Sequence, residues 1–129
     1  MMVTPLYAAV LALIFLVLSV RTLLLRRRYQ VAVGHGGEAA LERAGRAHGN
    51  FAEYVPFALI LIYFLERASG AAWTAHLLGS ALLLGRLIHC VGISRVKEDY
   101  RLRVAGMTLT FSVLAGAAMG VLLARWLWP

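Results

Sequence analysis

Mostly apolar residues fill four long stretches of this chain, over about residues 5–28, 38–66, 72–93 and 101–127. Each stretch is longer than about 20 residues, the length that an α-helix needs to cross the hydrocarbon core of a bilayer. The segments between the stretches are short and leave no room for a second folded unit. The pattern therefore predicts a single all-α domain over residues 1–129, an integral membrane four-helix bundle.

The composition agrees with a membrane protein. Of the 129 residues, 61% are hydrophobic, against about 45 to 50% in soluble domains. In the first stretch the basic residues follow the apolar run, so we expect a retained span and not a cleaved signal peptide. The single cysteine, Cys90, excludes a disulfide framework and a cysteine-based metal site, and the sequence predicts no metal site.

The net charge of +7 raises the possibility of a nucleic-acid partner, but the positions of the charges favour another explanation. The basic residues gather near the segments that join the first span to the second and the third span to the fourth: Arg26, Arg27, Arg28, Arg43, Arg46, Arg95, Lys97, Arg101 and Arg103. The opposite side keeps Arg67 and Arg125, with Trp126 and Trp128 as an interfacial belt. By the positive-inside rule, both joining segments face the cytoplasm and both termini face the periplasm. We expect a multi-pass protein of a bacterial inner membrane, with no nucleic-acid partner.

A polar stripe crosses the start of the second span. Arg43, Arg46, Asn50 and Glu53 fall within an arc of about 80° when each residue turns the helix by 100°. A charge inside a membrane helix costs about 2.5 to 3.5 kcal/mol on insertion scales. A bound ligand would offset that cost, and so would pairing with neighbouring helices, although interhelical polar contacts average only about 0.6 kcal/mol. The stripe favours a binding site, with structural pairing as the alternative.

Hairpin connections bring the inner ends of all four predicted spans to one depth. The polar residues at that depth are Arg26, Arg46, Asn50, Glu53, Arg86, His89 and Arg103. Guanidinium groups bind carboxylates bidentately, and a carboxylate binds an ammonium. The set suits a small zwitterion with more carboxylates than ammonium groups, a description that glutathione fits. We interpret Arg86 as a structural partner of Glu53 or of helix carbonyls.

Several motifs resemble those of one family. They are Glu42-Arg43-x-x-Arg46-Ala47-His48-x-Asn50-x-x-Glu53-Tyr54-x-Pro56 in the second span, Arg26-Arg27-x-Tyr29 in the first, Gly85-Arg86-x-x-His89 in the third, and Leu102-Arg103 with Thr108-Leu109 in the fourth. Together they resemble the MAPEG family, the membrane-associated proteins in eicosanoid and glutathione metabolism, and in length the short bacterial members. The resemblance covers nearly the whole chain.

The resemblance implies a homotrimer that holds glutathione as a co-substrate between neighbouring subunits, near the cytoplasmic face. It implies that one subunit binds glutathione through Arg46, Asn50, Glu53 and Tyr54, with His89 as a further contact. Arg26 and His48 would reach in from the adjacent subunit, and which of Arg26, Arg27 and Arg28 does so stays open. Arg103 matches the arginine that is set against the thiol, and it is the candidate catalytic residue.

Two functional classes follow. The first is a glutathione transferase or peroxidase that conjugates or reduces a lipophilic electrophile or peroxide; Ile93 and Val104 replace residues of the eicosanoid-forming members and favour such general chemistry. The second is a non-catalytic lipid-binding or scaffold protein of the same fold. A small multidrug exporter is disfavoured, because such exporters carry an acidic residue in their first span and this chain has none there.

Overall fold

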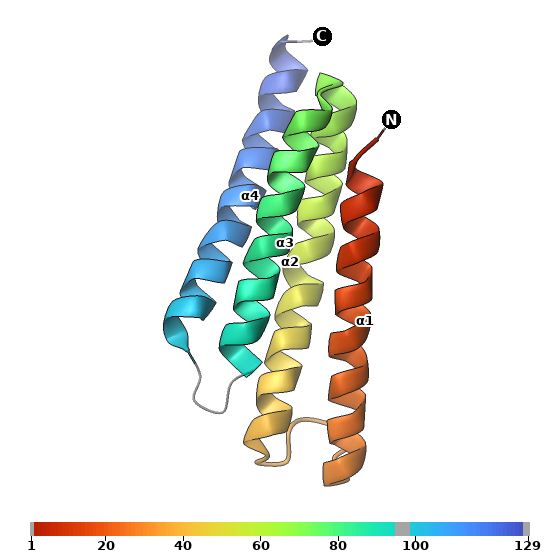
Figure 1. Cartoon of the computed structure of the whole chain (residues 1–129), viewed down its shortest axis with the longest axis vertical. Coiled ribbons are helices and arrows are strands. Elements are labelled where there is room, and N and C mark those ends of the chain that lie inside the picture. Colours follow the sequence, from red (N-terminus) through yellow and green to blue (C-terminus); the bar gives the residue numbers. More distant parts are fainter. Residues whose placement is uncertain (1, 95–98, 128–129) are drawn as a thin grey trace.

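A computed structural model shows four helices running side by side (Figure 1): α1 (Thr4–Tyr29), α2 (Ala39–Ser69), α3 (Ala72–Ser94) and α4 (Tyr100–Leu127). The structure describes residues 2–94 and 99–127, so the predictions for Arg95, Lys97 and Trp128 lie outside the described residues. No strand occurs within those ranges. The all-α prediction is confirmed.

Three of the helices, α1, α3 and α4, are long and apolar enough to cross a membrane. The helix α2 has 31 residues, which at 1.5 Å per residue gives a length of about 46 Å, but its first half carries the polar stripe. That α2 also spans the bilayer stays a prediction. The apolar surface agrees with a lipid environment, since large side chains such as Leu13, Phe57 and Leu122 are more than half exposed.

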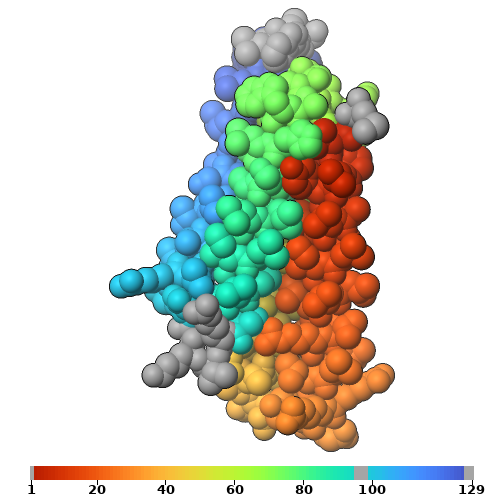
Figure 2. Space-filling view, viewed as in Figure 1, coloured from red at the N-terminus to blue at the C-terminus, as the bar shows by residue number. Residues whose placement is uncertain are grey.

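The helices α2 and α3 form the centre of the bundle. The helix α1 packs against both, and α4 packs against both from another side. Seen from the side of Figure 2, α3 lies between α1 and α4 and hides most of α2. The α1–α2 loop lies at the same end of the bundle as the end of α3 and the start of α4, whereas both termini lie at the other end (Figure 1). Four helix ends therefore meet where the polar residues are concentrated.

A carboxylate ties α2 to α1 at the opposite end. The helix α1 has no side-chain cap of its own, and its first backbone N–H groups need acceptors. Glu66 accepts from the N–H of Val3, from the N–H of Thr4 at 2.9 Å and from Thr4 Oγ1 at 2.6 Å. Glu66 is 5% exposed, so this buried contact fixes the position of α1 along α2. Gly70 then ends α2 in the left-handed conformation, with φ at 65°.

Small residues bring α3 and α4 together near the polar end of the bundle. A Cβ built on Gly106 would lie 2.6 Å from the carbonyl oxygen of Gly85 and 2.7 Å from the backbone nitrogen of His89. Gly116, nearer the other end of α4, would place a Cβ no nearer than 3.9 Å to Leu78. The tight approach is therefore at the polar end of the bundle, where it sets the positions of the site residues on α3.

Candidate functional site

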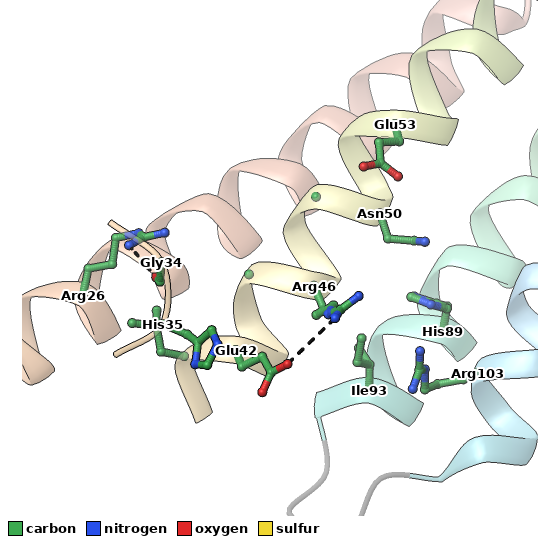
Figure 3. Close-up of a pocket in the computed structure, with 13 residues that line it drawn as sticks. Arg26, Gly34, His35, Glu42, Arg46, Asn50, Glu53, His89, Ile93 and Arg103 are labelled. Atoms are coloured by element: carbon green, nitrogen blue, oxygen red, sulfur yellow. Dashed lines mark hydrogen bonds and ion pairs between the residues drawn. The ribbon is translucent and has the colours of Figure 1, made fainter. Parts of the chain in front are cut away.

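A cleft of about 460 Å³ opens at the polar end of the bundle, between the α1–α2 loop and the ends of the four helices. Ligand pockets usually measure about 300 to 1,000 Å³. Six of the eight predicted site residues line this cleft: Arg26, Arg46, Asn50, Glu53, His89 and Arg103. Figure 3 shows Arg46, Asn50 and Glu53 along α2, with His89 and Arg103 opposite them on α3 and α4.

Helical spacing on α2 creates one wall of the cleft. Arg46, Asn50 and Glu53 follow one another at intervals of four and three residues, so they lie on the same face. Gly45 and Gly49 belong to the same wall, and a Cβ built on either glycine would meet nothing within 4 Å. The two glycines leave open space beside the charged side chains.

Arg46 and Glu53 of the α2 stripe make no strong ion pair within the described residues. Arg46 Nη2 lies 3.9 Å from Glu42 Oε1, and these side chains are 71% and 45% exposed. Exposed ion pairs of this kind contribute about 0 to 1 kcal/mol. Glu53 has no hydrogen bond or ion pair within the described part of the chain. Both groups remain available to a ligand.

Arg86 lies behind the cleft wall and is fully buried. Its Nη2 donates to Asn50 Oδ1 at 2.8 Å and lies 3.2 Å from His89 Nδ1, and its Nη1 donates to Met107 Sδ at 3.7 Å. The face of Phe51 lies 5.4 Å from its guanidinium carbon. The expected pairing with Glu53 or with helix carbonyls is therefore wrong, because Asn50 and His89 lie nearer to the buried guanidinium and accept its hydrogens.

Arg26 lines the cleft of its own chain. Its Nη1 donates to the carbonyls of Ala32 at 3.1 Å and Gly34 at 3.0 Å, which holds the α1–α2 loop against the end of α1. The resemblance implied that Arg26 reaches in from an adjacent subunit. Within one chain the loop already holds this guanidinium at the cleft edge, next to His35 (Figure 3).

His48 and Tyr54 do not line the cleft. His48 Nε2 lies 3.1 Å from Ser19 Oγ, and its ring stacks on Phe15 with centroids 4.8 Å apart. His48 is two residues from Arg46 and from Asn50, a turn of about 200° from each, so it faces α1. Tyr54 packs edge-on against Phe111 of α4, with centroids 5.3 Å apart. Their glutathione contacts stay predictions.

Arg103 lies in the first turn of α4, at the junction of three hollows. It lines the main cleft, a neighbouring polar hollow of about 410 Å³ with Arg43 and Arg46, and a groove of about 310 Å³ along α4. The groove is lined mainly by apolar groups, among them Met107 and Phe111. The polar cleft and the apolar groove therefore share one guanidinium.

Asp99 caps α4 beside Arg103. Its Oδ1 accepts from the N–H groups of Arg101 at 3.1 Å and Leu102 at 3.3 Å. These amides point along the helix axis and would otherwise attract an anion. Because Asp99 occupies them, the backbone N–H groups of Arg101 and Leu102 are not offered to the cleft.

Sequence reasoning did not name seven of the thirteen lining residues as site residues, among them His35, Glu42 and Ile93. The position of Glu42, four residues before Arg46 on the same helix face, was a usable signal. His35 lies in a glycine-rich loop whose path no periodicity predicts. Ile93 is apolar, and periodicity alone does not mark a single apolar residue in an apolar helix; its place among the residues that differ from the eicosanoid-forming members was the usable signal.

Comparison with known proteins decides the family. The model of the MAPEG family matches residues 4–123. The chain belongs to the MAPEG family. It is also similar to the inner membrane protein YecN of Escherichia coli K12 and of Escherichia coli O6:H1, with 40% identity over 113 residues in each case, which cover 88% of this chain and 85% of each relative.

The cleft described above therefore belongs to a membrane protein of the MAPEG family. The three apolar helices agree with it. The motif residues of this MAPEG protein divide into two groups: those that line the cleft, such as Arg46 and Glu53, and those that pack elsewhere, such as His48 and Tyr54. The cleft is the candidate site for its chemistry.

Proposed function

We propose that this MAPEG protein binds glutathione in the cleft and activates its thiol for attack on a lipophilic electrophile or peroxide. One observation carries the proposal: Arg103 belongs both to the polar cleft and to the apolar groove along α4. A polar thiol peptide and a lipophilic molecule have different solvation needs, and they meet at this side chain. Arg103 is the proposed catalytic residue.

The charges of the cleft suit glutathione. Arg26, Arg46 and Arg103 provide guanidiniums, and Glu53 provides a carboxylate. Glutathione carries two carboxylates and one ammonium. The guanidiniums pair with carboxylates in a geometry that lysine does not offer, and the Glu53 carboxylate pairs with the ammonium. A purely anionic ligand would be repelled by the Glu53 carboxylate and would leave that carboxylate without a partner of opposite charge.

The chemistry of activation is electrostatic. The thiolate, not the thiol, is the nucleophile, and a free thiol with a pKa of about 8.5 is only about 3% ionised at pH 7. A guanidinium near the sulfur stabilises the thiolate and lowers the pKa of the bound thiol. The thiolate then attacks the electrophilic atom of the second substrate, and the leaving group of that substrate carries away the electron pair.

A homotrimer is part of the proposal. Large apolar side chains are exposed on the helices that bound the cleft, among them Leu23 of α1 and Val104 of α4. A neighbouring subunit in the membrane would cover the cleft and contribute residues such as His48. The name of the YecN relatives supports the inner membrane as the location. The concentration of basic residues at the cleft end of the bundle supports a cytoplasmic cleft and periplasmic termini by the positive-inside rule.

The test measures glutathione binding to the detergent-solubilised protein by titration calorimetry. We expect Glu53→Gln to weaken binding about tenfold or more, because it removes a charged hydrogen-bond partner that contributes about 1.5 to 3 kcal/mol. The matched control is Arg67→Ala, an exposed residue at the far end of α2, which leaves the affinity unchanged.

Equal effects of the two variants would exclude the α2 stripe as the site. Binding of glutathione without any thiolate signal, or no binding at all, would support the second class, a lipid-binding or scaffold protein of the same fold.

A further inference from the structure

Arg86 is the one fully buried charged side chain in the described part of the chain. It does not line the cleft, and the proposed chemistry does not use it. Its Nη2 contacts two residues that do line the cleft, Asn50 at 2.8 Å and His89 at 3.2 Å. A buried guanidinium is costly, so its effect on these two neighbours needs an explanation.

The hydrogen-bond chemistry of arginine restricts both neighbours. A guanidinium has five N–H donors and no acceptor. The two N–H groups of Nη2 can serve one partner each, so both partners must accept. Asn50 must therefore present its carbonyl oxygen to Arg86, which turns its NH₂ group the other way. His89 must present a bare Nδ1, and in a neutral imidazole the hydrogen is then on Nε2.

The freed donors belong to two residues that line the cleft. Neither Asn50 Nδ2 nor His89 Nε2 has a hydrogen-bond partner among the described residues. The only buried side-chain nitrogen or oxygen without a partner in that part of the chain is Arg86 Nε, so the other two atoms are accessible. Both residues line the cleft, and Figure 3 shows them on facing walls, on α2 and α3.

We propose that Arg86 is a positioning residue that sets the amide orientation of Asn50 and the tautomer of His89, so that both offer only N–H donors to the ligand. This part of the cleft then accepts a carbonyl or carboxylate oxygen and rejects a ligand N–H donor. The statement about the ligand rests on the proposed function; the statement about the tautomer does not.

Fixing the donors in advance gives the buried guanidinium of Arg86 a role that its hydrogen bonds alone do not. Without Arg86 the amide of Asn50 can rotate by 180° and the proton of His89 can move to Nδ1. Each change replaces a donor by an acceptor, and a ligand oxygen would then face a lone pair. The close approach of α4 at Gly106 to the backbone nitrogen and Cβ of His89 fixes the place of His89 on α3, from which its ring reaches Arg86.

The decisive measurement is ¹⁵N NMR of histidine-labelled protein in detergent, without ligand. The signal of His89 among the four histidines is assigned by its loss in His89→Gln. We expect the wild-type protein to show the Nε2–H tautomer, with an unprotonated Nδ1. A wild-type spectrum with the hydrogen on Nδ1 would overturn the proposal without any variant.

Variants separate positioning from general structural support. In Arg86→Met we expect a mixture of both tautomers and a loss of glutathione affinity of about tenfold, because one or two hydrogen bonds to the ligand lose their alignment. Arg86→Lys keeps a buried donor and restores the Nε2–H tautomer in part. The matched control is Thr110→Val, which alters another fully buried polar residue and leaves the His89 signal unchanged. An unchanged tautomer in folded Arg86→Met would refute the proposal.

The two proposals fail separately. If glutathione does not bind the wild-type protein while His89 shows the Nε2–H tautomer, the function is wrong and the role of Arg86 stands. If glutathione binds while His89 carries its hydrogen on Nδ1, the function stands and the role of Arg86 is wrong.

Discussion

Replacing Arg103 by alanine tests the proposed chemistry most directly. Arg103 is the charged residue that the cleft and the α4 groove share. The substitution removes its guanidinium from both hollows. Alanine has a high helix propensity, and the cap that Asp99 provides uses the backbone N–H groups of Arg101 and Leu102, not the side chain of Arg103. The start of α4 should therefore remain folded.

The size of the effect follows from charge and distance. An opposite charge within about 4 to 6 Å lowers a pKa by about 1 to 3 units. A decrease of about 2 units from about 8.5 raises the thiolate fraction of bound glutathione at pH 7 from about 3% to about 75%. We expect Arg103→Ala to reduce the thiolate signal about 25-fold. The rate falls by a smaller factor, because a thiol of higher pKa is intrinsically more nucleophilic.

The assay records the ultraviolet absorbance of the thiolate when glutathione is added to the purified protein, over a range of pH. In the wild-type protein the absorbance should rise about 2 pH units below that of free glutathione, and in Arg103→Ala the two curves should coincide. The control is Arg101→Ala, an exposed arginine in the same helical turn that lies about 200° around the helix from Arg103.

One result would refute this reasoning: a wild-type thiolate signal that persists in Arg103→Ala while glutathione still binds. Another group would then stabilise the sulfur. A loss of signal of the same size in Arg101→Ala would show that net positive charge at this end of the bundle, and not the position of Arg103, produces the effect.

Two predictions concern stability. Glu66→Gln should lower the free energy of unfolding by about 1 to 3 kcal/mol, because the buried carboxylate accepts three hydrogen bonds at the start of α1; thermal unfolding in detergent measures the loss, and an unchanged melting temperature would contradict the assignment. Gly106→Ala should cost about 1 to 3 kcal/mol, since its Cβ would meet backbone atoms of α3 at 2.6 and 2.7 Å. Gly116→Ala, on the same helix with 3.9 Å of room, is the control and should change little; equal effects would contradict the close packing of α3 and α4 near the site.

The sequence by itself determined the helical architecture and one wall of the site. Apolar stretches longer than a bilayer core predict long helices wherever they occur. The period of 3.6 residues places Arg46, Asn50 and Glu53 on one face before any partner is known. Chain reversals between the helices bring Arg26 and Arg103 to the same end. These features depend only on neighbours along the chain.

The tertiary structure decided which groups meet between helices. Periodicity fixes the angle of a side chain about its own helix, but not the rotation of that helix against its neighbours. For that reason the sequence did not reveal that Arg86 bonds to Asn50 and His89, or that Glu66 receives the start of α1. A glycine in a helix makes a close contact with a neighbouring helix possible. Only the packing decides that α4 approaches α3 closely at Gly106 and not at Gly116.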